Sequence, residues 1–285
     1  MDDVSLDFGG QVNLVLGTNG SGKSTLINII AGVTYPQKGI LTLGNNELRS
    51  SDRRGWRRGI EAARAGMGFM LDKHGYPTYL DGIELLEWAS SKWDADWTGR
   101  IAQKLDMNAF LHRPIGGYSS GMAQKLGLGT SVVSRPKVVL WDEPTANLDA
   151  PTRRSVSGLI EELAKEGTTF VIASHTPADF EGVADWMCVM RLGRVVVSGM
   201  IKDLSAGSAR LIIESDHPSL LAAEALRSGL AIRAEIRNGC AELETRAGVT
   251  DIGAVRKIAG AVGATVSSME MKPRSISELY AEAIA

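Results

Sequence analysis

The sequence has few residues of the kinds that cross-link a chain or bind structural metal ions. Only two cysteines, Cys188 and Cys240, occur in 285 residues, and they form no Cys-x-x-Cys pair and no Cys/His cluster. This pattern excludes a disulfide-rich scaffold and argues against a structural zinc site. A reduced, cytoplasmic chain is the simpler interpretation.

Long apolar runs and a strong net charge are also lacking. No stretch approaches the roughly 18 consecutive apolar residues that cross a bilayer, and the acidic N-terminal segment lacks a signal-peptide pattern. The formal net charge is −2 and the pI is near 6.1, so no basic field predicts a nucleic-acid partner. If the protein works at a membrane, a partner must hold it there.

Apolar residues make up 44% of the chain, enough for a sizeable core, and they fall into two alternating patterns. Short β-branched runs predict strands buried on both faces, at Val12–Leu16, Lys137–Trp141, Thr168–Ala173 and Trp186–Met190. Amphipathic stretches between them predict helices at Lys23–Ala31, Ser120–Ser134 and Pro151–Lys165. Strands that alternate with helices predict an α/β fold with a mostly parallel sheet.

The pattern changes near Leu204–Arg210, which looks like a short linker. Beyond it we expect the order βαββαβ and a closing helix, which is typical of a small ferredoxin-like α+β domain. The predicted elements are Arg210–Glu214, Pro218–Arg227, Ala231–Glu235, Cys240–Glu244, Val249–Val262, Ala264–Met269 and Ser275–Ala283. We therefore expect one domain over residues 1–207 and a second over residues 208–285.

A glycine-rich segment lies between the first predicted strand and the first predicted helix. It fits GxxxxGK[ST], the P-loop pattern, in which glycines let backbone N–H groups face phosphates at a helix N-terminus. Lys23 would reach the β- and γ-phosphates of ATP, and Ser24 would bind Mg²⁺. The expected phosphate-binding residues are Gly17, Thr18, Asn19, Gly20, Ser21, Gly22, Lys23, Ser24 and Thr25.

Two acidic residues follow a second apolar run, in the segment Val138–Pro144. Asp142 would emerge at the carboxyl end of a buried strand, where its carboxylate can hold Mg²⁺. Glu143 would act as the catalytic group that polarises the attacking water. Such a pair is alone also compatible with a solvated turn, but its position after a P-loop favours the metal and water roles.

The segment Tyr118–Met122 lies between these motifs and resembles the signature LSGGQ of ABC transporter ATPase subunits. The resemblance implies that Ser119, Ser120, Gly121 and Met122 contact the γ-phosphate held on a second subunit. It extends to Asn147–Asp149, similar to the D-loop, in which Asp149 joins the two nucleotide sites. It also extends to His175, similar to the switch histidine of the catalytic site. The sequence departs from the common signature at Tyr118, Ser120 and Met122, and the first and last changes also occur in one exporter branch.

Other segments resemble this family with departures. Gly68–Leu80 resembles the Q-loop region, but Asp72 stands where a glutamine is usual and is a tentative Mg²⁺ ligand. The helix expected at Asp81–Ser91 lies in the region that docks onto the membrane subunit in the family. The first strand of the family, with its adenine-stacking aromatic residue, has no counterpart before the P-loop, so we expect weak nucleotide binding with little discrimination between ATP and GTP.

The closing segment Ser275–Tyr280 resembles the last helix of ATPases that serve ABC-2 type exporters for drugs, sodium or antibiotics. The resemblance implies an ATP- and Mg²⁺-dependent motor subunit, peripheral on the cytoplasmic face of the membrane and bound to a polytopic membrane subunit. It would act as a homodimer or heterodimer. The alternatives are a non-transport ABC ATPase acting on DNA or ribosomes, and a regulatory module that binds ATP without hydrolysis.

One segment outside these motifs is locally basic. Arg49–Arg58 contains five arginines. We interpret it as a solvated loop or helix face, with attraction to a membrane surface as the alternative.

Overall fold

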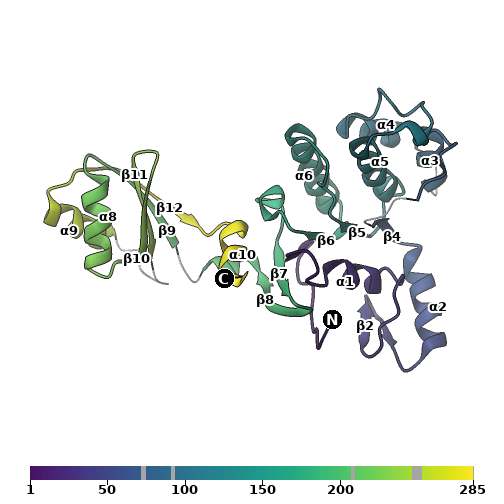
Figure 1. Cartoon of the computed structure of the whole chain (residues 1–285), viewed down its shortest axis with the longest axis horizontal. Helices are drawn as coiled ribbons and strands as arrows, with labels where there is room; N and C mark the ends of the chain where they lie inside the picture. Colours follow the sequence, from purple (N-terminus) through teal and green to yellow (C-terminus); the bar gives the residue numbers. More distant parts are fainter. Residues whose placement is uncertain (72–74, 91–93, 207–208, 246–251, 285) are drawn as a thin grey trace. The chain divides into compact units, whose positions relative to one another are not determined.

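A computed structural model describes residues 1–71, 75–90, 94–206, 209–245 and 252–284 of the chain. These form two compact units (Figure 1), one of residues 1–199 with 283–285 and one of residues 200–282. The helical turn that ends at Ser205 occupies part of the segment expected as a linker.

A six-stranded sheet in the order β4-β5-β6-β1-β7-β8 forms the centre of the first unit. Strands β4 to β7 in this order run parallel, which confirms the predicted α/β core. All six residues of β1 are buried, because helices cover both faces. The strands are β1 (Val12–Gly17), β4 (Met67–Met70), β5 (Val138–Asp142), β6 (Thr169–Ser174), β7 (Trp186–Arg191) and β8 (Arg194–Met200).

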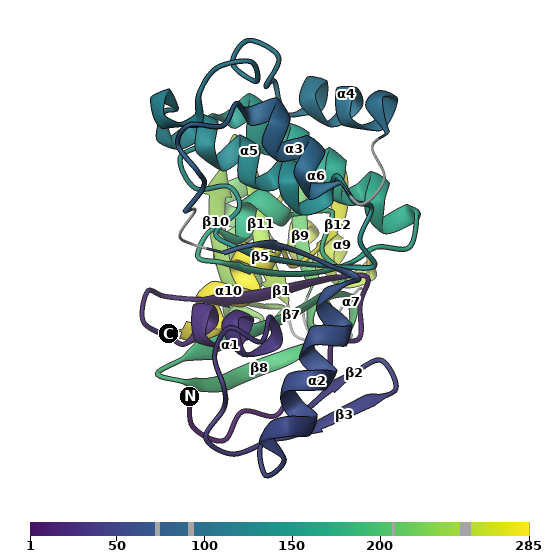
Figure 2. The ribbon, with the colours of Figure 1, turned by 90° about the vertical axis from the view of Figure 1, so that its right-hand side faces the viewer.

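Helices lie on both faces of this sheet. Figures 1 and 2 show α1 (Lys23–Ile30), α2 (Arg53–Arg64) and the hairpin β2 (Ile40–Leu43) and β3 (Asn46–Arg49) on one face. The other face carries the helices α3 (Gly82–Ala89), α4 (Ala95–Lys104), α5 (Ser120–Val132) and α6 (Ala150–Lys165). Two 3₁₀ turns, η1 (Ile115–Gly117) and η2 (Pro177–Phe180), complete the unit.

Glycines set how closely α5 approaches the sheet. A Cβ on Gly68 of β4 would overlap the Ser131 carbonyl of α5, so only glycine permits this contact. Trp141 of β5 is fully buried beneath α5 and donates its indole N–H to Ser131 Oγ at 2.8 Å. This packing holds β4 and β5 close to the C-terminal end of α5.

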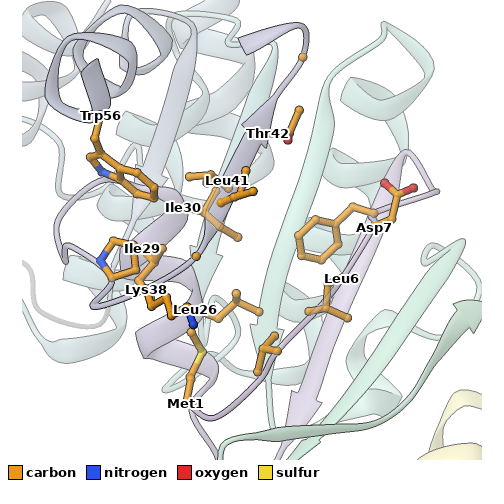
Figure 3. A pocket seen from close by; sticks show the side chains of 16 residues that line it. Met1, Leu6, Asp7, Leu26, Ile29, Ile30, Lys38, Leu41, Thr42 and Trp56 are labelled. Carbon is orange, nitrogen blue, oxygen red and sulfur yellow. The ribbon is translucent and has the colours of Figure 1, made fainter. Parts of the chain in front are cut away.

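Residues 1–10 contain no strand. Phe8 packs edge-on against Trp186 with ring centroids 5.2 Å apart. The segment lines a cavity of about 690 Å³ beside α1, in which Leu6 and Asp7 lie across from Leu41 and Thr42 of β2 (Figure 3).

The second unit is a four-stranded antiparallel sheet in the order β10-β11-β9-β12. With the helices between the strands, this is the ferredoxin-like arrangement expected from the sequence. Its apolar core includes Leu211, Ile213, Leu221 and Leu243. The elements are α7 (Ile201–Ser205), β9 (Ala209–Ser215), α8 (Pro218–Arg227), β10 (Ala231–Arg237), β11 (Cys240–Thr245), α9 (Ile252–Val262), β12 (Val266–Pro273) and α10 (Ile276–Ile284).

Candidate nucleotide site

The glycine-rich loop joins the end of β1 to the start of α1, as the pattern requires. A Cβ on Gly17 would lie 2.5 Å from the Met190 carbonyl, so no larger residue fits there. Gly20 and Gly22 have φ of 78° and 107°, in the region that favours glycine. Thr18, Asn19 and Gly20 are exposed, so their backbone is open to a ligand.

Lys23 is the first residue of α1 and is only 5% exposed. Its Nζ donates to the carbonyl oxygens of Gly17 at 2.8 Å and Thr18 at 3.3 Å. It also lies 3.6 Å from Glu143 Oε1. These contacts fold the ammonium back over the loop, where bound phosphates would meet it.

Polar groups of the loop fit a phosphate and a cation. Ser21 Oγ is buried without a hydrogen-bond partner, a cost that a ligand in the loop would relieve. Ser24 and Thr25 are exposed at the first turn of α1, where the helix N-terminus favours anions.

Glu143 and His175 come together at neighbouring strand ends. Asp142, the last residue of β5, pairs with Ala173 of β6. The next residue, Glu143, has φ of 51°, a left-handed conformation that is costly outside glycine and is held by its N–H bond to the Ala173 carbonyl at 2.9 Å. Its Oε2 lies 2.8 Å from His175 Nδ1. The strained turn thus aims the carboxylate at both Lys23 and His175.

Asp142 is 3% exposed at the carboxyl end of β5. With the Ser24 hydroxyl it supplies hard oxygen donors, the type that Mg²⁺ prefers. No cluster of three or more His, Cys, Asp or Glu suited to a metal ion occurs in the described part of the chain. The two donors therefore fit a Mg²⁺ ion whose other ligands are water and phosphate oxygens. Asp72, the tentative third ligand, lies outside the described residues.

The segment 118–122 begins α5. Ser119 caps this helix, its hydroxyl accepting from the Met122 N–H at 3.2 Å. Tyr118 anchors the preceding turn, because its hydroxyl donates to the Phe110 carbonyl at 2.8 Å. Ser119 and Ser120 are exposed, and no recorded hydrogen bond or ion pair links them to the loop 17–25 among the described residues.

The segment 147–149 lies beside this helix start. A Cβ on Gly121 would lie 3.0 Å from the Asn147 carbonyl, so the two segments touch. Asp149 caps α6, and its carboxylate accepts from the Thr152 N–H at 3.0 Å. Hydrogen bonding to Thr152 lowers the pKa of Asp149 and keeps it ionised.

Sequence reasoning gave no role to Gln124, which is buried in α5. Its Nε2 donates to the backbone carbonyls of Glu143 at 2.8 Å and Pro144 at 3.0 Å. It thereby connects the helix that starts at the signature segment to the turn that carries Glu143. A glutamine six residues after the start of the signature segment was the only signal for it in the sequence.

Comparison with known proteins decides the family. The family described as "ABC transporter" matches residues 1–146, half of the chain. The chain belongs to the ABC transporter family. As an ABC protein it is an ATP-binding subunit of a transporter and an ATPase.

Relatives within the family differ in their described roles. The "Uncharacterized ABC transporter ATP-binding protein YdbJ" of Bacillus subtilis is 27% identical over 75% of this chain and 68% of its own length. The "Molybdenum import ATP-binding protein ModC" of Vibrio vulnificus is 28% identical over 73% of this chain. The matched region spans only 56% of that protein.

Solved structures agree on the fold of this ABC subunit. A dimeric structure of MJ0796, described as a bacterial ABC transporter cassette, superimposes with a TM-score of 0.60 at 20% identity. It covers 69% of this chain and 88% of its own. The likeness establishes the cassette fold.

Proposed function

We propose that this chain is the motor subunit of an ABC exporter, coupling MgATP-driven dimer closure to transport by a separate membrane subunit. The observation that carries the proposal is the contact of Glu143 with Lys23 and His175 at the mouth of the glycine-rich loop. Lys23 would bind the β- and γ-phosphates, and residues 17–25 would cradle them with backbone N–H groups.

Hydrolysis needs a base near the γ-phosphate and a group that senses it. Glu143 is positioned to orient the attacking water once nucleotide draws Lys23 to the phosphates. His175, about half exposed at 54%, would contact the γ-phosphate and hold Glu143 in place. Mg²⁺ held by Ser24 and Asp142 would neutralise charge that develops on the phosphate oxygens.

The signature segment supports a composite site between two subunits. Ser119 and Ser120 are exposed at a helix N-terminus, a position that binds anions. In a head-to-tail pair, residues 119–122 of one subunit would face the phosphates bound to the other, and Asp149 would lie near the interface between the two subunits. The relative MJ0796 is described as dimeric, which agrees with such a pair.

A membrane partner is supported by the helical region. No helix of the described residues is long and apolar enough to cross a bilayer. Tyr79 and Trp88 are 80% and 82% exposed, and aromatic residues of this kind are enriched at protein–protein interfaces. We propose that they contact a polytopic membrane subunit at the cytoplasmic face of the membrane.

The export direction rests on the segment resemblances. Ser275–Tyr280 lies at the start of α10 and is similar to the closing helix of ABC-2 exporter ATPases. Tyr118 and Met122 are also found at these signature positions in one exporter branch. A relative named for import, ModC, shows that the family alone includes the opposite direction.

The test is a pull-down from native membranes with tagged Glu143→Gln protein and MgATP. We expect a polytopic membrane protein to co-purify, and the same protein with Tyr79→Ala and Trp88→Ala added to lose it. In the chain that keeps Glu143, these two substitutions should leave basal ATP turnover unchanged. Ile236→Ala in β10, also an exposed apolar residue at 45%, is the matched control and should retain the partner. Recovery of only soluble proteins or nucleic acid by ATP-competent protein would contradict the transporter role.

If the partner is found, substrate movement in inverted vesicles assigns the direction. ATP-dependent uptake into inverted vesicles supports export. Loss of substrate from preloaded inverted vesicles would contradict it.

A further inference from the structure

The helix α2 has a strongly divided surface. Five arginines, all exposed, occupy one side of its twelve residues: Arg53, Arg54, Arg57, Arg58 and Arg64. Trp56 and Ile60 occupy the adjacent side and are buried at 4% exposure each. They pack with Leu48 of β3 in a small apolar cluster.

Close packing fixes which side of α2 faces solvent. A Cβ on Gly59 would overlap Leu48, and a Cβ on Gly32 would overlap Ile60. The Asp52 carboxylate caps the helix by accepting from the Gly55 N–H at 2.9 Å. The close packing of Gly59 and Ile60 therefore fixes the rotation of α2 and leaves its arginines facing outward.

A cavity of about 350 Å³ lies between the arginine side of α2 and the end of α1. Its charged lining consists of three arginines and one acidic residue, Arg53, Arg57, Arg64 and Glu61. An apolar wall is formed by Val33, Tyr35, Trp56 and Ile60. Val33 is 56% exposed, so part of this wall faces water.

Aromatic contacts hold the wall in place. The rings of Tyr35 and Trp56 meet edge-to-face with centroids 5.4 Å apart. The Arg53 guanidinium lies 5.6 Å from the Tyr35 ring centre. The Tyr35 hydroxyl donates to the Ser50 carbonyl at 2.6 Å, a third contact that fixes the side chain.

The positive charge of this side is only partly balanced. The one acidic residue of α2, Glu61, bonds to Arg57 at 2.9 Å. Arg54 and Arg58 have no recorded ion pair among the described residues, and the whole chain carries a net charge of −2. The positive field is therefore local and directed outward from α2.

We propose that this cavity and the arginines of α2 bind the phosphate headgroups of anionic phospholipids at the membrane surface. A phospholipid offers a phosphate to Arg53, Arg57 and Arg64 and an apolar body to the Val33–Tyr35 wall. A nucleic-acid backbone or an acidic peptide would use the charges but leave the apolar wall in water. Clusters of basic residues beside apolar side chains are typical of surfaces that bind anionic lipid.

Vesicle co-sedimentation tests this proposal with the full chain. Wild-type protein should bind vesicles of phosphatidylcholine with phosphatidylglycerol and leave pure phosphatidylcholine vesicles unbound. Arg53→Gln, Arg57→Gln and Arg64→Gln combined should weaken binding by about 100-fold, since each basic residue near an anionic surface contributes about fivefold. Raising the ionic strength from about 0.1 M to about 1 M should release the wild-type protein, because the Debye length becomes shorter and the charges are screened more strongly.

A matched variant separates a local site from total charge. Arg227→Gln, Arg233→Gln and Arg237→Gln remove the same charge from exposed positions of the second unit and should leave binding unchanged. Equal loss in both triple variants, or equal binding to the two vesicle types, would overturn the proposal. The proposal would also be overturned if nucleic acid or an acidic peptide displaced the protein from vesicles and both triple variants bound that competitor equally weakly.

Inorganic phosphate and glycerol 1-phosphate distinguish a lipid headgroup from a free phosphate. Saturable binding of either, lost in the α2 variant and unaccompanied by vesicle binding, would assign the cavity to soluble phosphates and overturn the lipid proposal. The vesicles contain no membrane subunit, so the result does not depend on the proposed transporter role. ATP turnover of the three proteins, measured separately, should be the same.

Discussion

The strands of the two units differ in how they are buried. In β1 all six residues are buried, whereas β11 alternates buried and half-buried residues along its length. The cause is the number of covered faces, because helices pack on both faces of the first sheet and α8 and α9 occupy one face of the second. Continuous and alternating apolar patterns therefore predict different sheets in one chain.

The units also differ in what their interiors contain. The first buries Lys23 and Asp142 and holds Glu143 in a left-handed conformation. In the described part of the second unit, the only buried polar residues are Ser205 and Thr245, and its charges pair on the surface, as Arg210 does with Glu242 at 3.0 Å. Buried charge thus marks where the chemistry lies, since it costs stability unless it is compensated.

The largest expected difference between the units is in ATP turnover. Glu143→Gln should lower turnover by about 100-fold or more, because the water loses its base. Glu242→Gln removes an equal charge in the second unit and should leave turnover unchanged. Steady-state phosphate release measures the turnover of both variants. A comparable loss in the two would contradict the claim that ATP hydrolysis depends on residues of the first unit only.

Core truncation tests whether the second unit can weaken alone. Leu243 is fully buried in β11, so Leu243→Ala should destabilise that unit by about 2–5 kcal/mol. Urea unfolding monitored by circular dichroism should show this unit unfolding at a lower urea concentration than the first unit. ATP turnover should persist at urea concentrations at which only the second unit is unfolded. Leu220→Ala, at a position 53% exposed, should change stability by less than about 0.5 kcal/mol. Turnover that falls together with the early transition would contradict this separation.

A smaller effect is expected from the link between α5 and the Glu143 turn. Gln124→Ala removes two bonds to backbone carbonyls and should lower kcat about tenfold with little change in KM, because Gln124 positions Glu143 without contacting nucleotide. Gln103→Ala, on the exposed side of α4, serves as control. An equal change in both variants, or a change in KM alone, would show that Gln124 has no positioning role.

The smallest predicted effect is a gain of stability in the second unit. A Cβ on Gly260 in α9 meets no atom within 4 Å, so Gly260→Ala should stabilise that unit by about 1 kcal/mol through helix propensity. Gly263→Ala should destabilise it, since Gly263 has φ of 67°. The unfolding temperatures of the two variants should shift in opposite directions. Shifts in the same direction would contradict the backbone conformations described for Gly260 and Gly263.

Much of the fold was predictable because its patterns are local. The helix α8 has the predicted bounds Pro218–Arg227, set by a proline at its first turn. Strand ends differ from the predictions by a few residues, since ladder pairing extends β9 and β12 beyond their apolar centres. Local pattern therefore gives the elements of the second unit, and pairing sets the ends of their strands.

The candidate site was only partly predictable. Sequence spacing predicted the phosphate loop and the acidic pair, but the 2.8 Å contact between Glu143 and His175 depends on β5 and β6 being neighbours in the sheet. The Gln124 bridge depends in the same way on how α5 packs. Contacts between segments distant in sequence leave no periodic signal.

The central proposal is that each complete site is shared between two subunits. For a pair of two copies of this chain, mixing two inactive variants tests it most directly. Lys23→Ala disables the phosphate loop, and Ser120→Glu places a carboxylate where the partner's phosphate would lie. Glutamate at this exposed first turn is compatible with the helix. With the wild type as active reference, each variant alone should be inactive. An equal mixture should regain about a quarter of wild-type turnover, because half of the pairs then hold one intact site. A mixture that stays inactive, or a Ser120→Glu protein with full turnover, would contradict the shared site.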